Sequence, residues 1–370
     1  MKILFTCGGT AGHINPAVAL ARLFQERSGA EVLFVGAKGG MEGRLVPKEG
    51  FALETVTISS FWRSVSPASI KHNLTTVRNL SVSRKEANRI LDDFQPDLVV
   101  GTGGYASYPV VHEAAKRGIP TAVHDSNAVP GLTTKRLAKV ADRVMVGYEA
   151  SRAHYQHPER VVVTGTPVRG DFFKLDRQQA RAALGITDDR PLVLSYWGSL
   201  GAEGMNQHMT EYLRLAAADG APFHHIHGAG RDFATMTKVL EGENLPKDLE
   251  IREYIYDMPT VMQAADLVLC RGGASTLSEL TAIGKPAVIV PSPYVTNNHQ
   301  EKNANVLAQA GGAVVLLEPV CSGALLYKTT KELLADAPRR ERMAKAMADM
   351  GIPDAAEKIY ETLAELAKGE

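Results

Sequence analysis

The sequence contains few cysteines and no long apolar run. Its three cysteines, Cys7, Cys270 and Cys321, lie far apart and form no C-x-x-C pair. Neither a disulfide framework nor a structural zinc site is therefore expected. No stretch approaches the ~20 apolar residues that a membrane-spanning helix requires. The N-terminus also lacks a basic segment followed by an apolar run and a cleavage site. We therefore expect a reduced cytoplasmic protein that is not exported.

Neither sign of charge dominates the chain as a whole. Lys and Arg number 41, as do Asp and Glu, so the charge balance predicts no nucleic-acid partner. The charge is unevenly distributed, however, because basic residues exceed acidic ones by six in residues 1–165 and the reverse holds for the remainder. Either one half contacts an anionic surface, or the two halves differ by chance.

The length of 370 residues predicts two domains, since one hydrophobic core seldom serves so long a chain. Strand-like apolar runs alternate with helical patterns, which predicts parallel sheets with ligands at the carboxyl ends of their strands. Gly165–Arg169 is interpreted as a linker, after which a second strand and glycine turn begin. We expect an α/β fold of two Rossmann-like domains, residues 1–164 and 165–352, facing each other across a cleft. A terminal helix at 353–370 is expected to pack back on the first domain.

The glycine-rich segment Gly8–His13 follows an apolar strand at residues 2–6 and opens a helix that ends at Gly29. Backbone amides at such a turn favour an anion, so Thr10, Ala11 and Gly12 are candidate binding residues. His13 is a candidate base beside this site, because imidazole titrates near neutrality. The alternatives are a tight turn without a ligand, or a histidine that caps the helix or binds a phosphate.

A nicotinamide-dinucleotide site is disfavoured by the same segment. The dinucleotide fingerprint is G-x-G-x-x-G, with an acidic residue about 20 positions further on at the end of the next strand. Here the glycines fall as G-G-x-x-G, and the strand at 32–35 ends in Gly36-Ala37-Lys38 without an acidic residue. A dehydrogenase is therefore not expected.

Loops with glycine, histidine or small polar residues recur along the whole chain. They are Gly8–His13, Gly101–Tyr105, His124–Thr133, Gly165–Arg169, Trp197–Ala202, Arg271–Glu279 and Asn298–Ala304. Each loop alone is weakly specific, but their order and spacing together resemble the MurG family of peptidoglycan N-acetylglucosaminyltransferases. The resemblance covers nearly the whole chain and implies the GT-B fold, with the site between the two domains.

The resemblance further implies inverting transfer of N-acetylglucosamine from UDP-GlcNAc to the 4-hydroxyl of the muramoyl sugar of lipid I, which gives lipid II and UDP. No cofactor is expected. No metal is expected either, because the chain contains no Asp-x-Asp triplet, the commonest metal-diphosphate pattern of glycosyltransferases. Ser199 and the amides of its glycine turn, with Arg169 as a cation, are candidates to stabilise the leaving diphosphate instead. The alternative for Arg169 is a salt bridge between the domains.

The resemblance implies further binding residues in both domains. A carboxylate at Glu279 suits the two ribose hydroxyls of a uridine nucleotide, and Ile255 corresponds to a backbone contact with uracil. The remaining donor-side residues are Gly201, Ala274, Ser275, Thr276, His299 and Gln300, and the residues facing the acceptor are Gly103, Gly104, Tyr105 and Asn127. Two loops depart from the family pattern: Trp197 and Leu200 replace Gly and Gln of G-G-S-Q-G, and Asp125-Ser126 replaces Glu-Gln.

A histidine cluster at His224, His225 and His227 is more consistent with packing than with a metal, because only His225 and His227 would share a strand face.

The acceptor's polyprenyl tail requires docking to an anionic membrane surface, so the resemblance places the protein peripherally on the inner face of the plasma membrane. Phe61-Trp62-Arg63 and the apolar and basic residues at 70–89 suit such docking. An ordinary surface helix explains the same pattern.

Two other functions fit parts of the sequence. One is a GT-B transferase with a different lipid acceptor, such as diacylglycerol, and the other is a membrane-docked nucleotide-binding protein without turnover. The sequence indicates no particular protein partner.

Overall fold

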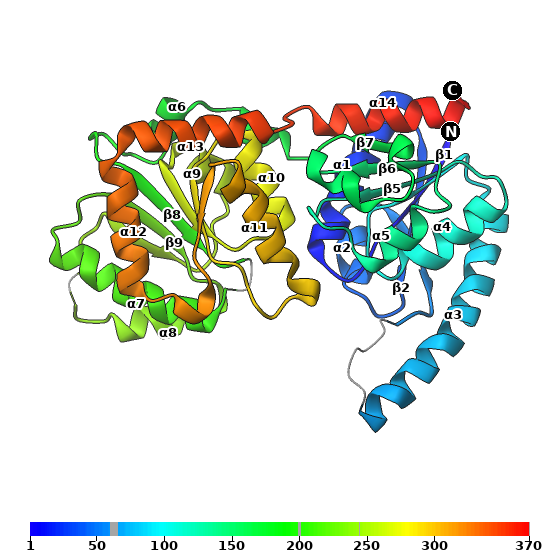
Figure 1. Ribbon diagram of the computed structural model, residues 1–370, viewed down its shortest axis with the longest axis horizontal. Coiled ribbons are helices and arrows are strands. Elements are labelled where there is room, and N and C mark those ends of the chain that lie inside the picture. Colours follow the sequence, from blue (N-terminus) through cyan, green and yellow to red (C-terminus); the bar gives the residue numbers. More distant parts are fainter. Residues whose placement is uncertain (60–65, 199–200, 244, 370) are drawn as a thin grey trace. The chain divides into compact units, whose positions relative to one another are not determined.

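A computed structural model describes residues 1–59, 66–198, 201–243 and 245–369 of the chain. The chain divides into two compact units (Figure 1). Unit 1 comprises Met1–Pro167 together with Asp354–Glu370, and unit 2 comprises Val168–Pro353. The C-terminal helix therefore belongs to the same unit as the N-terminal strand.

Unit 1 is built on a parallel sheet, in which the described residues form seven strands in the order β3-β2-β1-β4-β5-β6-β7. The order reverses between β1 and β4, and the loops after two such strands diverge to leave a binding site at the carboxyl edge. Residues from Ile3 to Thr6 of β1 pair with those from Leu98 to Gly101 of β4. The strands are β1 (Lys2–Thr6), β2 (Glu31–Ala37), β3 (Ala52–Val56), β4 (Leu98–Gly101), β5 (Thr121–Asp125), β6 (Arg143–Val146) and β7 (Val161–Val163).

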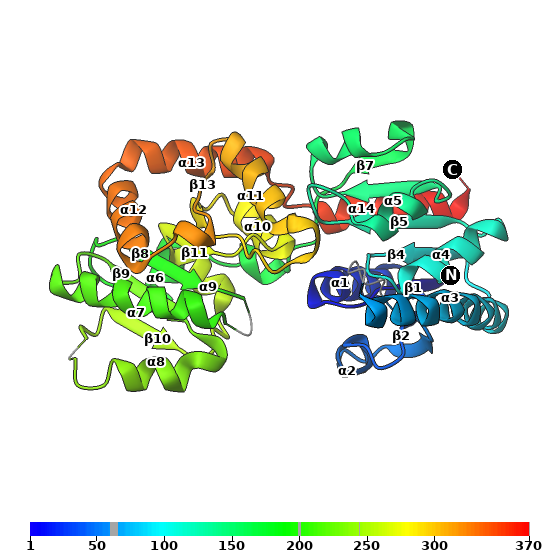
Figure 2. The same cartoon turned by 60° about the horizontal axis from the view of Figure 1, so that its bottom comes forward.

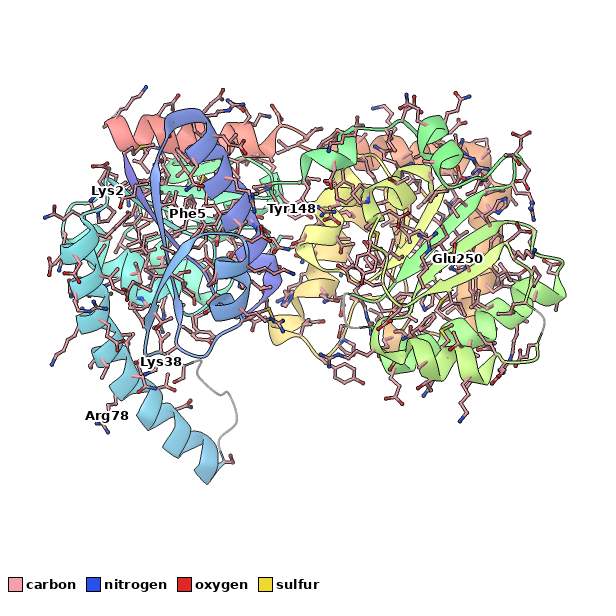
Figure 3. The ribbon with its side chains drawn as sticks, turned by 180° about the vertical axis from the view of Figure 1, so that it is seen from behind. Lys2, Phe5, Lys38, Arg78, Tyr148 and Glu250 are labelled. Atoms are coloured by element: carbon pink, nitrogen blue, oxygen red, sulfur yellow. The ribbon has the colours of Figure 1, made fainter. Side chains whose placement is uncertain are left out.

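Helices cover both faces of this sheet because successive strand residues point to opposite faces. Phe5 of β1 belongs to one apolar cluster and Leu4 to the other, and Figure 3 shows Phe5 inside the unit with Lys2 and Lys38 at its periphery. The first cluster includes residues of α1 (Ala11–Ser28), α2 (Glu42–Lys48) and α14 (Ala355–Lys368). The second includes residues of α3 (Pro67–Phe94), α4 (Ser107–Lys116) and α5 (Leu132–Leu137). Short 3-10 turns span Glu149–His154 and Pro158–Arg160.

The helix α3 is much longer than the sheet that it covers. Its C-terminal half contributes Ala87, Ile90 and Leu91 to the core, whereas its N-terminal end projects beyond the rest of unit 1 (Figures 1 and 3). No helix among the described residues is both long and apolar enough to cross a bilayer.

Unit 2 repeats the topology of unit 1. Within the described ranges its parallel sheet has six strands in the order β10-β9-β8-β11-β12-β13, so the switch point lies between β8 and β11. These two doubly wound sheets confirm the α/β class predicted from the alternating strand and helix patterns. The strands are β8 (Leu192–Tyr196), β9 (His224–Gly228), β10 (Leu249–Arg252), β11 (Leu267–Cys270), β12 (Ala287–Ile289) and β13 (Ala313–Val315).

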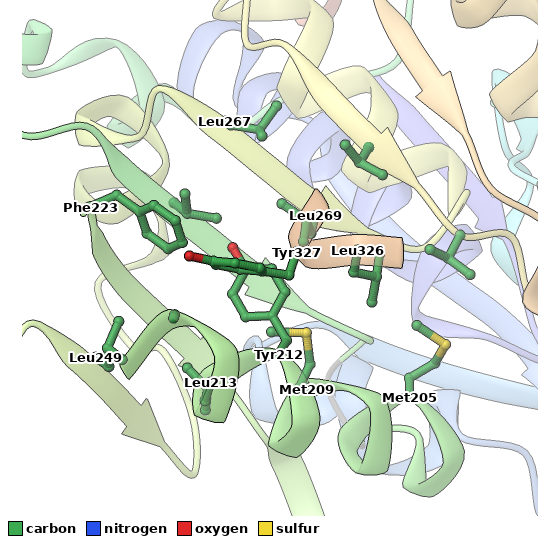
Figure 4. Close-up of a cluster of buried hydrophobic side chains, with 14 of the residues drawn as sticks. Met205, Met209, Tyr212, Leu213, Phe223, Leu249, Leu267, Leu269, Leu326 and Tyr327 are labelled. Carbon is green, nitrogen blue, oxygen red and sulfur yellow. The ribbon is translucent and has the colours of Figure 1, made fainter. Parts of the chain in front are cut away.

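The core of unit 2 is rich in aromatic residues and methionine. Tyr212, Phe223 and Tyr327 meet there, with the ring centroids of Tyr212 and Tyr327 5.5 Å apart in an edge-to-face arrangement (Figure 4). This cluster joins α7 (Glu203–Ala218) and α12 (Gly323–Ala335) to the sheet. The other helices of the unit (Figure 2) are α6 (Arg177–Ala183), α8 (Phe233–Val239), α9 (Met258–Ala264), α10 (Ala274–Ala282), α11 (His299–Gln309) and α13 (Ala337–Met350), with 3-10 turns at Gly170–Phe173, Gly230–Asp232, Thr296–Asn298 and Glu318–Val320.

The attachment of α14 to unit 1 gives a stability prediction. Leu363 is fully buried between α14 and α1 in the first apolar cluster. We expect Leu363→Ala to lower the free energy of unfolding of unit 1 by about 2–5 kcal/mol, because it removes buried methyl groups and leaves a cavity. Chemical denaturation monitored on unit 1 measures this change. Glu361→Ala on the exposed face of the same helix is the control and should change the free energy by less than about 0.5 kcal/mol. Equal effects of the two substitutions would contradict the packing.

Candidate functional site

The first candidate site lies at the carboxyl end of β1, where α1 begins. The cap residue Thr10 has an extended backbone (φ −146°, ψ 154°), and its side chain does not cap the helix. The Thr10 side chain satisfies no amide of the first turn, and the amide of His13 donates to the Thr10 carbonyl at 3.1 Å. Amides at a helix start without a side-chain cap can bind an anion. Thr10 and Gly12 are exposed, and Ala11 is the first residue of the helix.

The side chain of His13 is oriented by the backbone of this loop. Its Nδ1 atom lies 2.9 Å from the carbonyl oxygen of Gly8, and a carbonyl can only accept a hydrogen bond. Nδ1 therefore carries the proton, and Nε2 of the neutral ring has the free lone pair. This is the tautomer that a base acting through Nε2 requires. The contact is to Gly8 rather than to an amide of the helix, so the ring does not cap α1.

The loop after β4 fixes the position of His13 from the other side. The Thr102 hydroxyl donates to the main-chain carbonyl of His13 at 2.7 Å. A Cβ atom on Gly103 would lie 2.7 Å from Cδ2 of His13, and one on Gly104 would lie 2.1 Å from the carbonyl oxygen of Gly8. Both glycines also have positive φ, 109° and 83°, which other residues rarely adopt. Gly103 and Gly104, followed by half-buried Tyr105, thus bring the two predicted loops together.

The loop after β5 is organised by Asp125. Its Oδ1 accepts hydrogen bonds from the main-chain and side-chain nitrogens of Asn127 at 3.0 and 3.1 Å, and its Oδ2 accepts one from the Gly131 amide at 3.1 Å. His124 is fully buried and donates through Nε2 to the carbonyl of Gly165 at 2.9 Å. Burial lowers the pKa of His124, although its hydrogen bond to Gly165 and the nearby charge of Asp125 oppose this shift. Asp125, one of the two residues at which this loop departs from the family pattern, therefore shapes the backbone of the loop.

Glu42, the first residue of α2, is not among the candidates that the sequence indicated. Its side chain is fully buried, and its carboxylate accepts hydrogen bonds from the amides of Ala37, at 2.6 Å, and Gly9, at 3.4 Å. An acidic group thus does reach the end of β2, but it faces backbone amides rather than a solvent-accessible ribose site. The only sequence signal is an acid that closely follows the glycines Gly36 and Gly40.

The second candidate site is a cavity of about 410 Å³ at the carboxyl ends of β8 and β11 in unit 2. Two of the predicted residues line it, Gly201 and Gln300. Gln300 accepts a hydrogen bond from the Ser292 amide at 2.9 Å. The remaining lining residues are Trp197, Ala202, Glu203, Gly204, Arg271, Ser292, Tyr294 and Glu318.

An ion pair that the sequence did not indicate forms one wall of this cavity. Arg271 is almost fully buried and donates to Glu318 at 2.5 Å and to the Val290 carbonyl at 3.1 Å. Its guanidinium lies over the ring of Trp197, 5.9 Å from the centroid. The indole that replaces the family's glycine is thus packed against a buried cation.

Glu279 lies in α10 of unit 2, and its carboxylate is electrostatically unusual. Burial raises the pKa of Glu279 to about 7, against an opposing effect of Arg169 and a further rise caused by Asp171. Arg169 is exposed and lies 3.6 Å from Asp171, so the ion pair seen here is within unit 2 rather than between domains. A carboxyl group whose pKa is raised in this way is a candidate binding-site group.

The other predicted donor-side residues lie at the same edge of the unit 2 sheet. Ala274, Ser275 and Thr276 form the first turn of α10, whose cap residue Gly273 provides no side-chain cap. Ile255 is buried in the loop after β10, and His299 is the first residue of α11. Each therefore follows the carboxyl end of a strand, as predicted.

The three clustered histidines have protein partners. His225 and His227 both contact the Ser195 hydroxyl at 2.7 Å, so they share one face of β9 as expected. His227 also contacts the side-chain oxygen of Asn206 at 3.1 Å, and His224 pairs with Asp188 and Asp248. Among the described residues no group of three or more potential ligands is arranged to hold a metal.

Several predicted residues lie outside the described part of the chain, namely Ser199, Leu200 and the Phe61–Arg63 segment. Of the basic residues downstream, Arg84 pairs with Glu113 and Arg89 with Glu54 and Asp93. Arg78 and Lys85 are exposed on α3, and Figure 3 shows Arg78 directed away from the helix.

Comparison with known proteins places these two sites in a family. Residues 3–146 match the glycosyltransferase family 28 N-terminal domain, and residues 193–359 match the corresponding C-terminal domain. The UDP-N-acetylglucosamine--N-acetylmuramyl-(pentapeptide) pyrophosphoryl-undecaprenol N-acetylglucosamine transferase of Acetivibrio thermocellus is 41% identical, over 100% of this chain and 99% of the relative. The chain belongs to the MurG family of glycosyltransferases. The transferase of the same name from Thermoanaerobacter sp. (strain X514) is 42% identical over 98% of this chain and 99% of its own.

Solved structures agree with this assignment to the MurG family. The crystal structure of MurG from Acinetobacter baumannii has a TM-score of 0.79 and 25% identity, and covers 98% of this chain and 99% of its own. UDP-GlcNAc 2-epimerase from Neisseria meningitidis, solved with UDP-GlcNAc bound, has a TM-score of 0.64 at 17% identity, over 99% and 100% of the two chains. At that identity the second likeness concerns the fold alone. The expected GT-B fold class is confirmed.

The raised pKa of Glu279 predicts a pH-dependent difference in stability. Between its ordinary value of 4.5 and about 7 the folded state retains a proton that the unfolded state loses, so stability falls as pH rises through this range. We expect Glu279→Gln to unfold with the same free energy as the parent below pH ~4.5 and to be more stable by about 1–3 kcal/mol at pH 8. Denaturation at several pH values measures this. A difference that did not change with pH would contradict the prediction.

Proposed function

We propose that the chain transfers N-acetylglucosamine from UDP-GlcNAc to the 4-hydroxyl of the muramoyl sugar of lipid I, with inversion, giving lipid II and UDP for peptidoglycan synthesis. The observation that carries this proposal is full-length similarity to relatives named for this reaction. The structural likeness to an epimerase does not support epimerase activity for this chain, because at that identity it concerns the fold alone.

In the proposed mechanism His13 is the base. Direct displacement requires the acceptor hydroxyl to lose its proton as its oxygen attacks the anomeric carbon. The neutral Nε2 atom of His13 can accept that proton, since Nδ1 donates to Gly8. As the new bond to the anomeric carbon forms, the bond to the diphosphate oxygen breaks on the opposite face and UDP leaves. Thr10, Ala11 and Gly12, with Gly103, Gly104, Tyr105 and Asn127, would bind the acceptor.

Unit 2 would bind the donor. The amides at the start of α10, around Ser275 and Thr276, suit the diphosphate, as does the glycine turn that contains Ser199 and Gly201. Arg169 would add a positive charge to the departing UDP. Ionised Glu279 would accept hydrogen bonds from the ribose hydroxyls, while the backbone at Ile255 would contact uracil. Gln300, with His299, would orient the hydroxyls of the sugar from the wall of the cavity.

Unit 1 would also dock to the membrane that holds the lipid acceptor. Its projecting helix α3 carries Arg78 and Lys85 on its surface, and cations of this kind attract anionic lipid headgroups. We therefore propose a peripheral protein on the inner face of the plasma membrane.

Transfer from radiolabelled UDP-GlcNAc to a lipid I analogue tests the reaction. We expect labelled lipid II and UDP in equal amounts, without loss of turnover in EDTA. Diacylglycerol in place of lipid I, and a reaction without acceptor, are the comparison arms. Preference for diacylglycerol would favour a different lipid acceptor, and nucleotide binding without transfer to either would favour a non-catalytic protein.

The role of His13 is tested in the same assay. We expect His13→Ala to lower kcat by about 10²–10⁴-fold, the usual contribution of a general base, with little change in KM for UDP-GlcNAc. His157→Ala is the matched control, because His157 is a half-exposed histidine of unit 1 that pairs with Glu159. A rise confined to KM for the lipid acceptor would instead indicate that His13 binds the acceptor phosphate. Full turnover by His13→Ala would refute both roles.

Membrane docking is tested by flotation with phosphatidylglycerol vesicles. We expect binding that weakens as salt rises from 50 to 500 mM, because exposed charges are screened over about one Debye length. Arg78→Glu should weaken binding, and so should Trp62→Ala if the segment before α3 takes part. Glu243→Gln, on the surface of unit 2, is the control. Binding that was insensitive to salt and to both substitutions would contradict the proposal.

A further inference from the structure

The peptide bond between Gly8 and Gly9 is hydrogen-bonded on both sides. The Gly8 carbonyl accepts from Nδ1 of His13 at 2.9 Å, and the Gly9 amide donates to Oε2 of Glu42 at 3.4 Å. This peptide is trans, so its C=O and N–H point in opposite directions. One planar peptide unit therefore lies between the imidazole of His13 and the carboxylate of Glu42.

The surroundings of Glu42 are shaped for a carboxylate. Its other oxygen accepts the Ala37 amide at 2.6 Å, and its side chain has no exposed surface. A Cβ atom on Gly8 or Gly40 would lie 2.8 or 2.4 Å from Oε1, and one on Gly36 would lie 2.2 Å from Cγ. Three glycines thus leave the space that Glu42 fills, and backbone amides on two sides satisfy both of its oxygens. A buried carboxylate is tolerated when hydrogen bonds satisfy it in this way.

We propose that Glu42 is a positioning residue that acts on His13 through the Gly8–Gly9 peptide. A negatively charged acceptor on the N–H side polarises the peptide and makes its carbonyl oxygen a stronger acceptor. The stronger carbonyl holds the proton on Nδ1 of His13 and leaves Nε2 as the atom that accepts a proton. This inference rests on the proposed function, in which Nε2 removes the proton of the acceptor hydroxyl.

The arrangement of Glu42, the Gly8–Gly9 peptide and His13 is similar to that of a histidine oriented by a carboxylate. In a Ser-His-Asp triad the carboxylate binds Nδ1–H directly, fixes the tautomer and stabilises the imidazolium that forms. Here a peptide unit is interposed, so the carboxylate lies out of reach of water and of the bound substrate. The carboxylate stabilises the imidazolium through the dipole of the peptide rather than through contact.

Other titratable groups also face this pair. The Cys7 thiol at the end of β1 has its pKa raised to about 12, mainly by burial and further by the charge of Glu42. The pKa of Tyr105, in the loop after β4, is raised by burial and then by Glu42. His124 of β5 interacts with His13. Of these groups, Glu42 is the one that is linked to Nδ1 of His13 by continuous hydrogen bonds.

The test is the pH profile of Glu42→Gln. The amide oxygen can replace only one of the two carboxylate oxygens, so the NH2 group would face an amide that needs an acceptor. We expect kcat to fall about 10–100-fold, the range known for groups that orient metal-bound histidines, with KM for UDP-GlcNAc within about twofold. The acidic limb of the kcat/KM profile should move to lower pH, because the imidazolium loses stabilisation.

Glu49→Gln is the matched control. Glu49 follows the last residue of α2 and pairs on the surface with Arg22 of α1, so it is a glutamate at the other end of α2 that does not reach the Gly8–Gly9 peptide. We expect its kcat and pH profile to equal those of the parent. A folded Glu42→Gln variant with the parent's kcat and pH profile would overturn the proposal.

Nitrogen-15 NMR of labelled histidine supplies a readout that does not require the variant to fold. In the parent protein, with the His13 signals assigned by their loss in His13→Ala, we expect the neutral ring to carry its proton on Nδ1. The Gly9 amide proton should be protected from exchange. A neutral ring protonated on Nε2, or a Gly9 amide that exchanges freely, would overturn the proposal. Because this spectrum needs no turnover, failure of the proposed reaction in the parent is distinguishable from failure of this inference.

Discussion

Close approach of backbone to backbone at the carboxyl ends of the parallel strands is the constraint on which both candidate sites depend. In unit 1 a Cβ atom on Gly104 would lie 2.1 Å from the Gly8 carbonyl oxygen, and in unit 2 one on Gly272 would lie 2.3 Å from that of Gln300. Any side chain at these positions would separate loops that follow different strands. Contact between these loops places the ring of His13 against Gly103 in unit 1 and Gln300 at the cavity in unit 2.

The repeated topology explains why the sites fall where they do. Both sheets reverse their strand order once, between β1 and β4 and between β8 and β11. Connections leave such a pair of strands in opposite directions, so the backbone opens at that edge and the amides of the following helices point into the opening. The same sheet geometry thus supports a histidine-bearing loop in one unit and a cavity with a buried ion pair in the other.

The carboxyl groups of Glu42 and Glu279 show how differently the fold can treat the same group. Glu42 is enclosed by glycines and accepts a backbone amide on each oxygen, so it stabilises the loop around it. Glu279 has its pKa raised by burial, so the folded state keeps it ionised only at a cost in free energy. Such a cost in free energy is expected for a carboxylate that binds a ligand. A carboxylate whose oxygens already accept backbone hydrogen bonds, like that of Glu42, stabilises the protein's own backbone instead.

The sequence by itself determined the alternation of strands and helices, the two-sheet α/β class and the loops that carry the candidate residues. These features depend on neighbours a few positions apart, because strand and helix periodicity and turn chemistry are local. It also indicated His13, since a histidine at a glycine-rich helix start is visible in a short motif.

Only the tertiary structure decided which nitrogen of His13 carries the proton. The proton is on Nδ1 because the backbone turns so that the Gly8 carbonyl lies next to that atom. The tertiary structure alone revealed Glu42, which follows the end of β2 by five positions and contacts a loop 33 residues before it. The pair of Arg271 with Glu318, 47 positions away, was hidden in the same way. Hydrogen bonds and burial of this kind join segments that are remote in the chain, and no local pattern encodes how such segments meet.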